Sequence, residues 1–492
     1  MNYFNPYPLC VDNTVTTAWQ SQIAEAAKTP SLAELLAQRG GELFPRFASA
    51  YTDLRALPRG ARRALQRRLA HSRELSAVLQ EWLQQQSGRA LQQKLACTLG
   101  GAALLLGLGR GVSDAATIVV NTNVIGVVFG DNKCSLIEAI LNANAIAQIS
   151  PDCPPGDPDP TEDHIVLPKK TFTLTAPYST YYYDPTGLPL ITSKITIEGN
   201  GAKITRKKSS PSFRLMAVGA TGELELENLT LSGGVATYGG GGAVYNYGEL
   251  TVTNSTITGN NAFYGGGIYN NGSLTVTNST ISKNIVESFL YNGYDYGGFA
   301  GGIANHTTGV LTVTNSTITG NKAFASGGIG NYGGNMEING STVSKNSAFY
   351  GGGIGNYGNA PTQTITNSTI SGNSANLKSV KYGGYTNFYG GYGGGVLNDS
   401  SSLTITNSTI SGNKAVGKSR KFRSYGHTYV YTYGGKGGGI FNYSNLYLYG
   451  GTVTGNSATF YGGGIFNSGT LVNTSNVTGN KAKYGPNPNI YP

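Results

Sequence analysis

Residues that could act as acids, bases or metal ligands are sparse in the long C-terminal part of this chain. From Leu229 onward the acidic residues are Glu249, Glu287, Asp295, Glu337 and Asp399. Glycosidic bond hydrolysis needs two carboxylates facing each other across the bond. Only Glu287 and Asp295 share one short segment, so they are the only pair in this region that we expect to lie close together. The sequence therefore favours a protein that is not an enzyme.

The densest acidic group lies earlier in the chain and sits next to a histidine. It comprises Asp157, Asp159, Glu162 and Asp163, followed by His164. Carboxylates suit calcium, but the intervening prolines and the lack of a fixed ligand spacing favour a solvated surface loop over a calcium site. The four histidines are dispersed, and no glycine-rich phosphate-binding segment is present. We therefore predict no catalytic residue, no metal and no cofactor.

Three segments rich in tyrosine stand out as candidates for ligand contact. They lie at 286–300, 377–392 and 416–436, and the last two also contain lysine and arginine. Tyrosine combines a flat apolar ring with a polar tip, and neighbouring cations suit acidic glycans or anionic surfaces. The alternative is that these segments fold over the flank of the protein without a ligand. The candidate contact residues are Tyr382, Tyr385, Tyr389, Arg420, Arg423, Tyr425, Tyr429 and Tyr431.

A repeat must position these segments, because they interrupt a unit that recurs from residue 228 to 492. At 250–260 the unit reads LTVTNSTITGN, and a YGGGIYN corner follows it. Several repeats are 24 to 27 residues apart, a period typical of solenoids, in which each coil buries its apolar face only by stacking on the next. A β-propeller needs longer repeats. We predict an all-β, right-handed parallel β-helix.

Stacking places equivalent residues above one another and predicts two internal columns. One is aliphatic: Ile257, Ile281, Ile318, Val343, Ile370, Ile410, Val453 and Val477. The other consists of amides hydrogen-bonded along the axis: Asn246, Asn270, Asn305, Asn331, Asn356, Asn398, Asn442 and Asn467. The recurring Asn-Ser-Thr triplets match the N-glycosylation pattern, but their place at a coil corner favours a structural role.

The predicted N-terminal cap and first coils, 116–227, contain a strand-like run at 117–122, the segment KCSLIEAI at 133–140 and a loop with Cys153. In this order, from about 117 to 206, the chain resembles the CSLREA-type domain that opens many secreted bacterial β-helix proteins, with Ile137 in place of the arginine of the motif. The later coils resemble the repeats of polymorphic outer-membrane-type surface proteins. This resemblance implies a secreted or cell-surface protein.

Within this segment the sequence predicts a short capping helix and a nearby disulfide. Ser135 and Glu138 have the spacing of a capping box, and the helix would cover the open end of the solenoid. Cys134 and Cys153 are close enough in sequence to form a disulfide, with two free thiols as the alternative. A disulfide closing a loop of this size contributes about 3 kcal/mol to stability.

The N-terminal part has the pattern of an export signal behind an unusual extension. Lys94 precedes an apolar run at 95–108, and small residues end at Ala115, where we expect signal-peptide cleavage. The segment 94–115 is too short for a confident membrane span, so we do not expect an integral membrane protein after cleavage. Residues 1–93 are predicted to be helical, and are either a true extension or the product of a start site assigned too early.

The net charge of +10 is distributed along the chain rather than concentrated in one compact domain. Nucleic-acid binding is therefore disfavoured. The sequence instead predicts an exported, non-enzymatic adhesive or structural protein, secreted or at the cell surface. Its partner would be a carbohydrate, a cell-surface protein or a second copy. The alternative is a polysaccharide lyase or glycoside hydrolase on the same scaffold.

Overall fold

The computed structural model describes residues 116–145, 148–157, 162–181, 184–291, 294–358, 363–382, 385–400, 402–424 and 427–492. Side chains at 288–296, 380–387 and 422–429 are not described. The predicted helical extension at 1–93 and signal-like segment at 94–115 lie outside the described residues.

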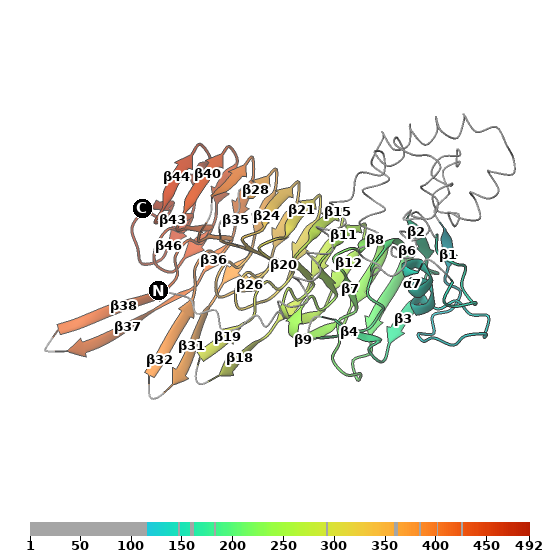
Figure 1. The fold of residues 1–492 in the computed structure, drawn as a ribbon. Coiled ribbons are helices and arrows are strands. Elements are labelled where there is room, and N and C mark those ends of the chain that lie inside the picture. The colour runs from blue at the N-terminus through green and yellow to red at the C-terminus, as the bar shows by residue number, and fades with distance from the viewer. Residues whose placement is uncertain are drawn as a thin grey trace, which may run out of the picture. The chain divides into compact units, whose positions relative to one another are not determined.

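The described residues form a parallel β-helix, which confirms the predicted solenoid (Figure 1). A typical coil contains β11 (Glu249–Thr253), β12 (Thr256–Thr258), β13 (Asn261–Tyr264) and β14 (Ile268–Asn270). Each strand pairs in parallel with its equivalent one coil later, as Ile257 does with Ile281. Alternating side chains point inward and outward because successive residues of a strand face opposite sides.

The first two strands of the coils join into one large sheet. Its strands besides β11 and β12 are β1 (Thr117–Val119), β2 (Asp163–Val166), β3 (Thr171–Leu174), β6 (Lys194–Arg206), β8 (Glu223–Ser232), β15 (Ser273–Thr277), β16 (Thr280–Ser282), β21 (Val310–Thr314), β22 (Thr317–Thr319), β24 (Asn335–Asn339), β25 (Thr342–Ser344), β28 (Gln363–Thr366), β29 (Thr369–Ser371), β34 (Leu403–Thr406), β35 (Thr409–Ser411), β40 (Asn445–Tyr449), β41 (Thr452–Thr454), β44 (Thr470–Asn473) and β45 (Asn476–Thr478).

The remaining strands of the coils form a second sheet and several short ones. The second sheet contains β14, β7 (Met216–Val218), β10 (Val244–Asn246), β20 (Ile303–Asn305), β23 (Ile329–Tyr332), β27 (Ile354–Tyr357), β33 (Val396–Asn398), β39 (Ile440–Asn442), β43 (Ile465–Asn467) and β47 (Ile490–Tyr491). The short strands are β13, β9 (Val235–Gly240), β17 (Ile285–Val286), β26 (Ser347–Ala348), β30 (Ser374–Ala375), β36 (Lys414–Ala415), β42 (Ser457–Ala458) and β46 (Lys481–Ala482), and β4 (Ser179–Tyr181) pairs with β5 (Asp184–Thr186).

The predicted aliphatic column forms the centre of the core. Ile257, Ile281 and Ile318 follow one another in register and are fully buried. The column continues in register to Val477, which is only partly buried in the last coil.

Glycine forms the corner that precedes the strands of the second sheet. A Cβ at Gly353 would lie 2.6 Å from the carbonyl oxygen of Gly395 in the following coil. Any larger residue would therefore separate the two coils.

The predicted amide column is present and runs along the second sheet. Asn246 Nδ2 donates to Asn270 Oδ1 at 2.7 Å, and Asn270 Nδ2 donates to Asn305 Oδ1 at 2.8 Å. The same bond links each next pair as far as Asn442 and Asn467, at 2.7 to 3.1 Å. These buried amides satisfy one another, as buried polar groups must.

A second amide ladder, which the sequence analysis missed, follows the large sheet. In every asparagine of this ladder after the first, Oδ1 accepts both the backbone N–H and the side-chain N–H of its equivalent one coil earlier. Oδ1 of the first, Asn260, accepts the N–H of Gly234. The available signal was the Asn that ends each Thr-Gly-Asn, Ser-Gly-Asn or Ser-Lys-Asn turn. The ladder comprises Asn260, Asn284, Asn321, Asn346, Asn373, Asn413, Asn456 and Asn480.

The Asn-Ser-Thr triplets have a local structural explanation. Asn254 adopts a left-handed conformation with φ of 49°, which asparagine tolerates better than most residues. Ser255 is buried: its Oγ donates to the carbonyl of Thr253 at 2.8 Å, and its N–H donates to Ser279 Oγ in the next coil at 3.0 Å. The triplet therefore builds the corner between the first two strands of a coil.

Helix α7 (Leu136–Asn144) lies at the N-terminal end of the solenoid and joins its core (Figure 1). Ser135 and Glu138 form the predicted capping box. Ile137, at the position of the motif's arginine, is buried among apolar residues. This position is therefore part of the core in this chain.

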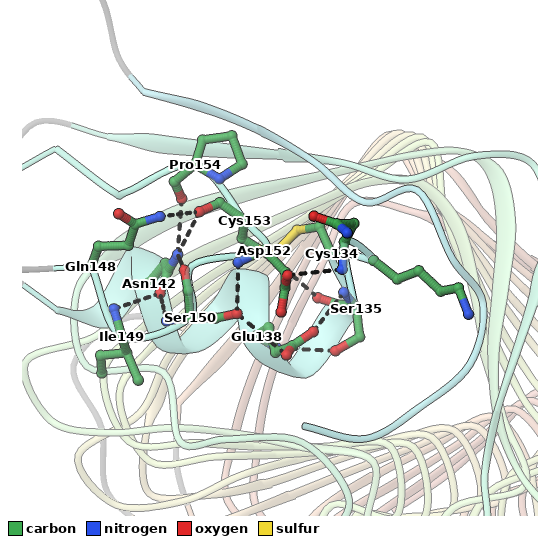
Figure 2. The surroundings of a disulfide bond; sticks show 12 residues. Cys134, Ser135, Glu138, Asn142, Gln148, Ile149, Ser150, Asp152, Cys153 and Pro154 are labelled. Atoms are coloured by element: carbon green, nitrogen blue, oxygen red, sulfur yellow. Dashed lines mark hydrogen bonds between the residues drawn. A yellow bond between two sulfur atoms is a disulfide. The ribbon is translucent and has the colours of Figure 1, made fainter. Parts of the chain in front are cut away.

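A disulfide between Cys134 and Cys153 ties the start of α7 to the loop that follows it (Figure 2). Asn142 organises this loop from the helix. Its Nδ2 donates to the carbonyl oxygens of Ser150 and Cys153, and its Oδ1 accepts the N–H of Ile149 at 2.9 Å. The helix, the loop and the disulfide together form a cross-linked cap.

Candidate interaction surface

The three tyrosine-rich insertions form antiparallel hairpins. They are β18 (Ser288–Tyr291) with β19 (Tyr294–Gly297), β31 (Leu377–Tyr382) with β32 (Tyr385–Gly390), and β37 (Gly417–Ser424) with β38 (His427–Gly434). Each follows the short strand of its coil, and the chain returns to one column of bridged residues at Phe299, Tyr392 and Lys436. All three project from the same side of the solenoid (Figure 1), as their common corner in the sequence predicts.

The second and third hairpins pack against each other. They leave consecutive coils, and the rings of Phe388 and Tyr433 lie 4.7 Å apart. Lys418 Nζ lies 5.4 Å from the centre of the Phe388 ring, and Lys378 Nζ lies 5.5 Å from that of Phe349 on the solenoid. These cation–π contacts hold the bases of both hairpins. Two coils without insertions separate this pair from the first hairpin.

Several predicted contact residues can be placed on these hairpins. Arg420 and Tyr431 are exposed and directly opposite each other on β37 and β38, so they share one face. Tyr389 is half-buried on β32, opposite Lys378. For four residues only the backbone is described, and Tyr425 lies outside the described residues. The four are Tyr382, Tyr385, Arg423 and Tyr429.

The second and third hairpins carry charge of one sign. The segments 377–392 and 416–436 contain seven lysines and arginines and no aspartate or glutamate. Lys418, Arg420 and Lys421 are exposed along β37, and Val430 and Tyr431 are more than half exposed on β38. The hairpin β37–β38 therefore presents cations beside apolar surface, a combination common at protein and glycan contacts.

An aromatic ladder beside the hairpins was not predicted. Tyr332 and Tyr357 stack 5.1 Å apart with planes 2° from parallel, and Phe441 and Phe466 stack at 4.9 Å. Burial raises the pKa of the Tyr332 and Tyr357 hydroxyls, whose common neighbour is Ser326. Since these rings cover one another's faces along the axis, they stabilise the stacking of coils and leave little flat surface for a sugar ring.

An acidic patch on the large sheet was also missed. Glu223, Glu225 and Glu227 alternate along β8 with buried leucines and are half-exposed. In register beside them lie Glu198 on β6 and Glu249 on β11. The motif Glu-Leu-Glu-Leu-Glu was the available signal, because alternation places all three carboxylates on one face. We define these five glutamates as the acidic patch.

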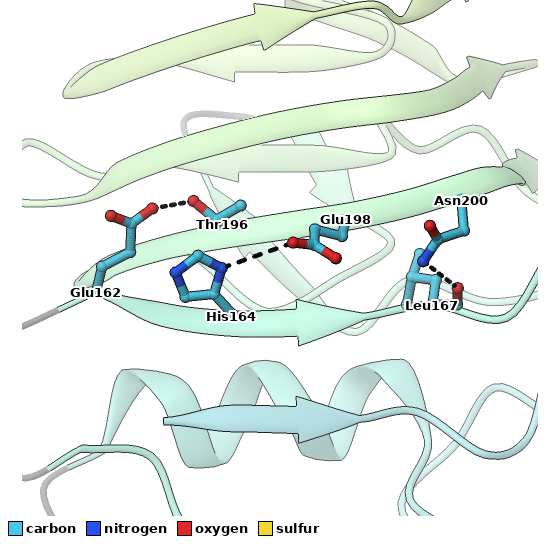
Figure 3. Close-up of polar contacts among 6 residues, drawn as sticks. All are labelled: Glu162, His164, Leu167, Thr196, Glu198 and Asn200. Carbon is cyan, nitrogen blue, oxygen red and sulfur yellow. Dashed lines mark hydrogen bonds and ion pairs between the residues drawn. The ribbon is translucent and has the colours of Figure 1, made fainter. Parts of the chain in front are cut away.

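Contacts at the edge of the acidic patch involve a lysine and a histidine, and Figure 3 shows the histidine beside Glu198. His164 Nδ1 lies 4.0 Å from a carboxylate oxygen of Glu198, and Lys194 Nζ lies 3.3 Å from Glu162. Thr196 donates a hydrogen bond to Glu162. Burial, followed by the nearby carboxylates of Glu162 and Glu227, raises the pKa of Glu225. The patch is therefore a concentration of negative charge that is compensated only at its edge, by Lys194 in register beside Glu223 and by His164 beside Glu198.

The acidic loop does not converge on one point. Asp163 points inward, is buried and accepts the N–H of Asp157 at 2.8 Å, whereas Glu162 lies at the outer edge of the sheet. Burial raises the pKa of Asp163 to about 6. Asp159 lies outside the described residues. Across the described ranges, no three His, Cys, Asp or Glu side chains come together as metal ligands.

The pair Glu287 and Asp295 stays a prediction. Glu287 is exposed just before β18, and Asp295 lies on β19 opposite Leu290 in backbone register. The side chain of Asp295 is among those not described.

No helix within the described residues has the length and apolarity needed to cross a membrane. Comparison of the chain with protein-family models, with curated proteins and with solved structures gave no match.

Proposed function

We propose that this protein is exported and acts outside the cell, secreted or at the cell surface, as a non-enzymatic adhesive or structural element. The observation that carries the proposal is the pair of packed, cationic hairpins β31–β32 and β37–β38 on one side of a long solenoid. The signal-like segment at 94–115 and the resemblance to secreted bacterial β-helix proteins support export. In this proposal the solenoid is a scaffold, and the hairpins make the contact.

The test is to remove both hairpins without disturbing the coils. The coil at 347–350 has no insertion and joins Ala348 to Tyr350 through Phe349 alone. Replacing 376–391 and 416–435 by a single phenylalanine each should reproduce that connection. The trimmed protein should melt within a few degrees of the parent, because long surface loops add little closure entropy. It should lose binding to cells or to a glycan array, and the binding of the parent should weaken as salt rises.

The first hairpin provides a matched control, because 286–300 is rich in tyrosine but contains no lysine or arginine. Replacing 287–298 by phenylalanine should leave binding largely intact if the cations matter. A doubly trimmed protein that folds and still binds like the parent would refute the proposed contact surface.

A second candidate function is a carbohydrate-active enzyme, and the acidic patch is the observation that favours it. Glu225 and Glu227 lie two residues apart on β8, roughly 6.6 Å along the strand, and glycoside hydrolysis uses carboxylates roughly 5 to 10 Å apart. Glu225, whose pKa is raised, could act as the acid and Glu227 as its partner. Turnover of a polysaccharide panel by the parent, lost in Glu225→Gln, would favour this candidate over the adhesive one.

A further inference from the structure

The solenoid carries two surfaces of opposite charge. The cationic surface is the hairpin β37–β38, with Lys418, Arg420 and Lys421 exposed. The anionic surface is the acidic patch. No ion pair is formed by Glu223, Glu227 or Glu249 with a lysine or arginine of the described residues, nor by the three hairpin cations with a carboxylate there. The three hairpin cations therefore lack a counter-charge within the described part of their own copy. Among the described residues, the five carboxylates of the patch are offset only at its edge, by Lys194 in register beside Glu223 and by His164 beside Glu198.

These surfaces are too far apart to meet in one molecule. The coils of β8 and β34 are six steps apart in the sheet, through β11, β15, β21, β24 and β28. At the usual strand spacing this is roughly 29 Å along the axis. The patch lies on the large sheet, whereas the hairpin leaves the coil after the short third strand. An ion pair between them therefore requires a second molecule.

The acidic patch also contains like charges that stand next to each other. Glu198 pairs in register with Glu227, and Glu223 pairs in register with Glu249. Like charges directly opposite each other in a sheet are destabilising. A cationic partner would relieve this repulsion, and the exposed Tyr431 and Val430 beside the hairpin cations would add apolar contact.

We propose that the hairpin β37–β38 of one copy docks on the acidic patch of a second copy, which makes a head-to-tail contact. This inference rests on the proposed function, because it names the partner of the hairpins. A strand of eight residues extends roughly 27 Å, enough to cross the strands that carry the patch. Because the two surfaces differ, each pair of molecules still has one unoccupied hairpin and one unoccupied patch. Association can therefore continue into a chain of molecules. Opposite charge would also favour contact of a hairpin with a patch over contact of two hairpins or of two patches.

Two variants of the full chain test the proposal, each lacking one surface. The hairpin variant is Lys418→Gln with Arg420→Gln and Lys421→Gln. The patch variant is Glu223→Gln with Glu225→Gln and Glu227→Gln. Molar mass is measured by light scattering over a range of concentrations at low and high salt. The parent should associate at low salt and dissociate at high salt, and each variant should associate at least about tenfold more weakly.

Mixing the variants gives the sharpest outcome. The patch variant keeps its hairpin, and the hairpin variant keeps its patch, so an equimolar mixture should form a dimer that cannot grow further. A control with the same charge change elsewhere, Lys283→Gln with Lys322→Gln and Lys345→Gln at exposed positions, should associate like the parent.

Three results would overturn the inference: a parent that stays monomeric at low salt, a patch variant that associates like the parent, or a mixture that stays monomeric. The inference can fail while the proposed function holds. The patch variant would then fail to dimerise with the hairpin variant but would still bind cells or acidic glycans. This combination would show that the hairpins act on an external partner instead.

Discussion

Asparagine side chains inside the solenoid act as donor and acceptor at once, because the amide carries two N–H donors and a carbonyl oxygen. Asn321 accepts the backbone and side-chain N–H groups of Asn284 at 2.9 and 3.0 Å. It donates to Asn346 Oδ1 and to the carbonyl of Ile281. Replacing Asn321 by alanine would leave several buried polar groups without partners.

We expect Asn321→Ala to lower the free energy of unfolding by about 2 to 4 kcal/mol, measured by urea denaturation. The matched control is Asn315→Gly in the same coil. Asn315 adopts a φ of 48° at an exposed corner, a conformation that glycine also adopts easily. Its replacement should change stability by less than about 0.5 kcal/mol. Equal effects of the two substitutions would contradict the role of the ladder.

The buried carboxyl of Asp163 should make stability depend on pH. Burial raises its pKa from 3.8 to about 6, so between these values the folded state holds a proton that the unfolded state has released. The free energy of unfolding therefore falls as pH rises through this window. Asparagine cannot ionise but can still accept the N–H of Asp157. Asp163→Asn should be more stable than the parent at pH 7, and the difference should vanish near pH 4. Thermal melts of both proteins at a series of pH values measure this. Melting temperatures that differ by the same amount at every pH would contradict it.

At the scale of elements, the coils were predictable because their signal is local and repeated. The alternation around Ile257 identifies a strand, and its recurrence fixes which residues stack. The capping box at Ser135 and Glu138 is equally local. The insertions were located because they interrupt the period, but their folding into hairpins and the contact of Phe388 with Tyr433 depend on the spacing of neighbouring coils.

The acidic patch shows why other elements could not be predicted. The repeat recognisable in the sequence begins at Asn228, so β6 and the three glutamates of β8 precede it. The pairing of Glu198 with Glu227 further depends on the register between β6 and β8, which shifts directly after this pair. Contacts between non-repeating strands require the register itself, which alternation alone does not provide. The aromatic ladder, by contrast, had an available signal, because Phe441 and Phe466 directly precede Asn442 and Asn467 and share the register of the amide column.

At the scale of the whole solenoid, stability should be distributed along the axis, because each coil contacts mainly its neighbours. The second amide ladder ends within the last described coil, where Asn489 Oδ1 accepts both the backbone and side-chain N–H groups of Asn480 at 3.2 Å. Asn489→Ala would remove this acceptor. We expect faster hydrogen exchange over residues 465–482, measured by mass spectrometry, with the effect fading over the next coils and absent at 303–343.

Asn487→Gly is the control for this last change. Asn487 has a φ of 51° and is exposed, so glycine should be accepted there without loss of protection. Faster exchange in all coils of Asn489→Ala would mean that the solenoid opens as one cooperative unit. A graded effect would instead mean that the amide ladders and the aromatic stack couple each coil to its neighbours alone. The second and third hairpins, which lie toward the C-terminal end of the axis, would then sit on the coils that open most easily.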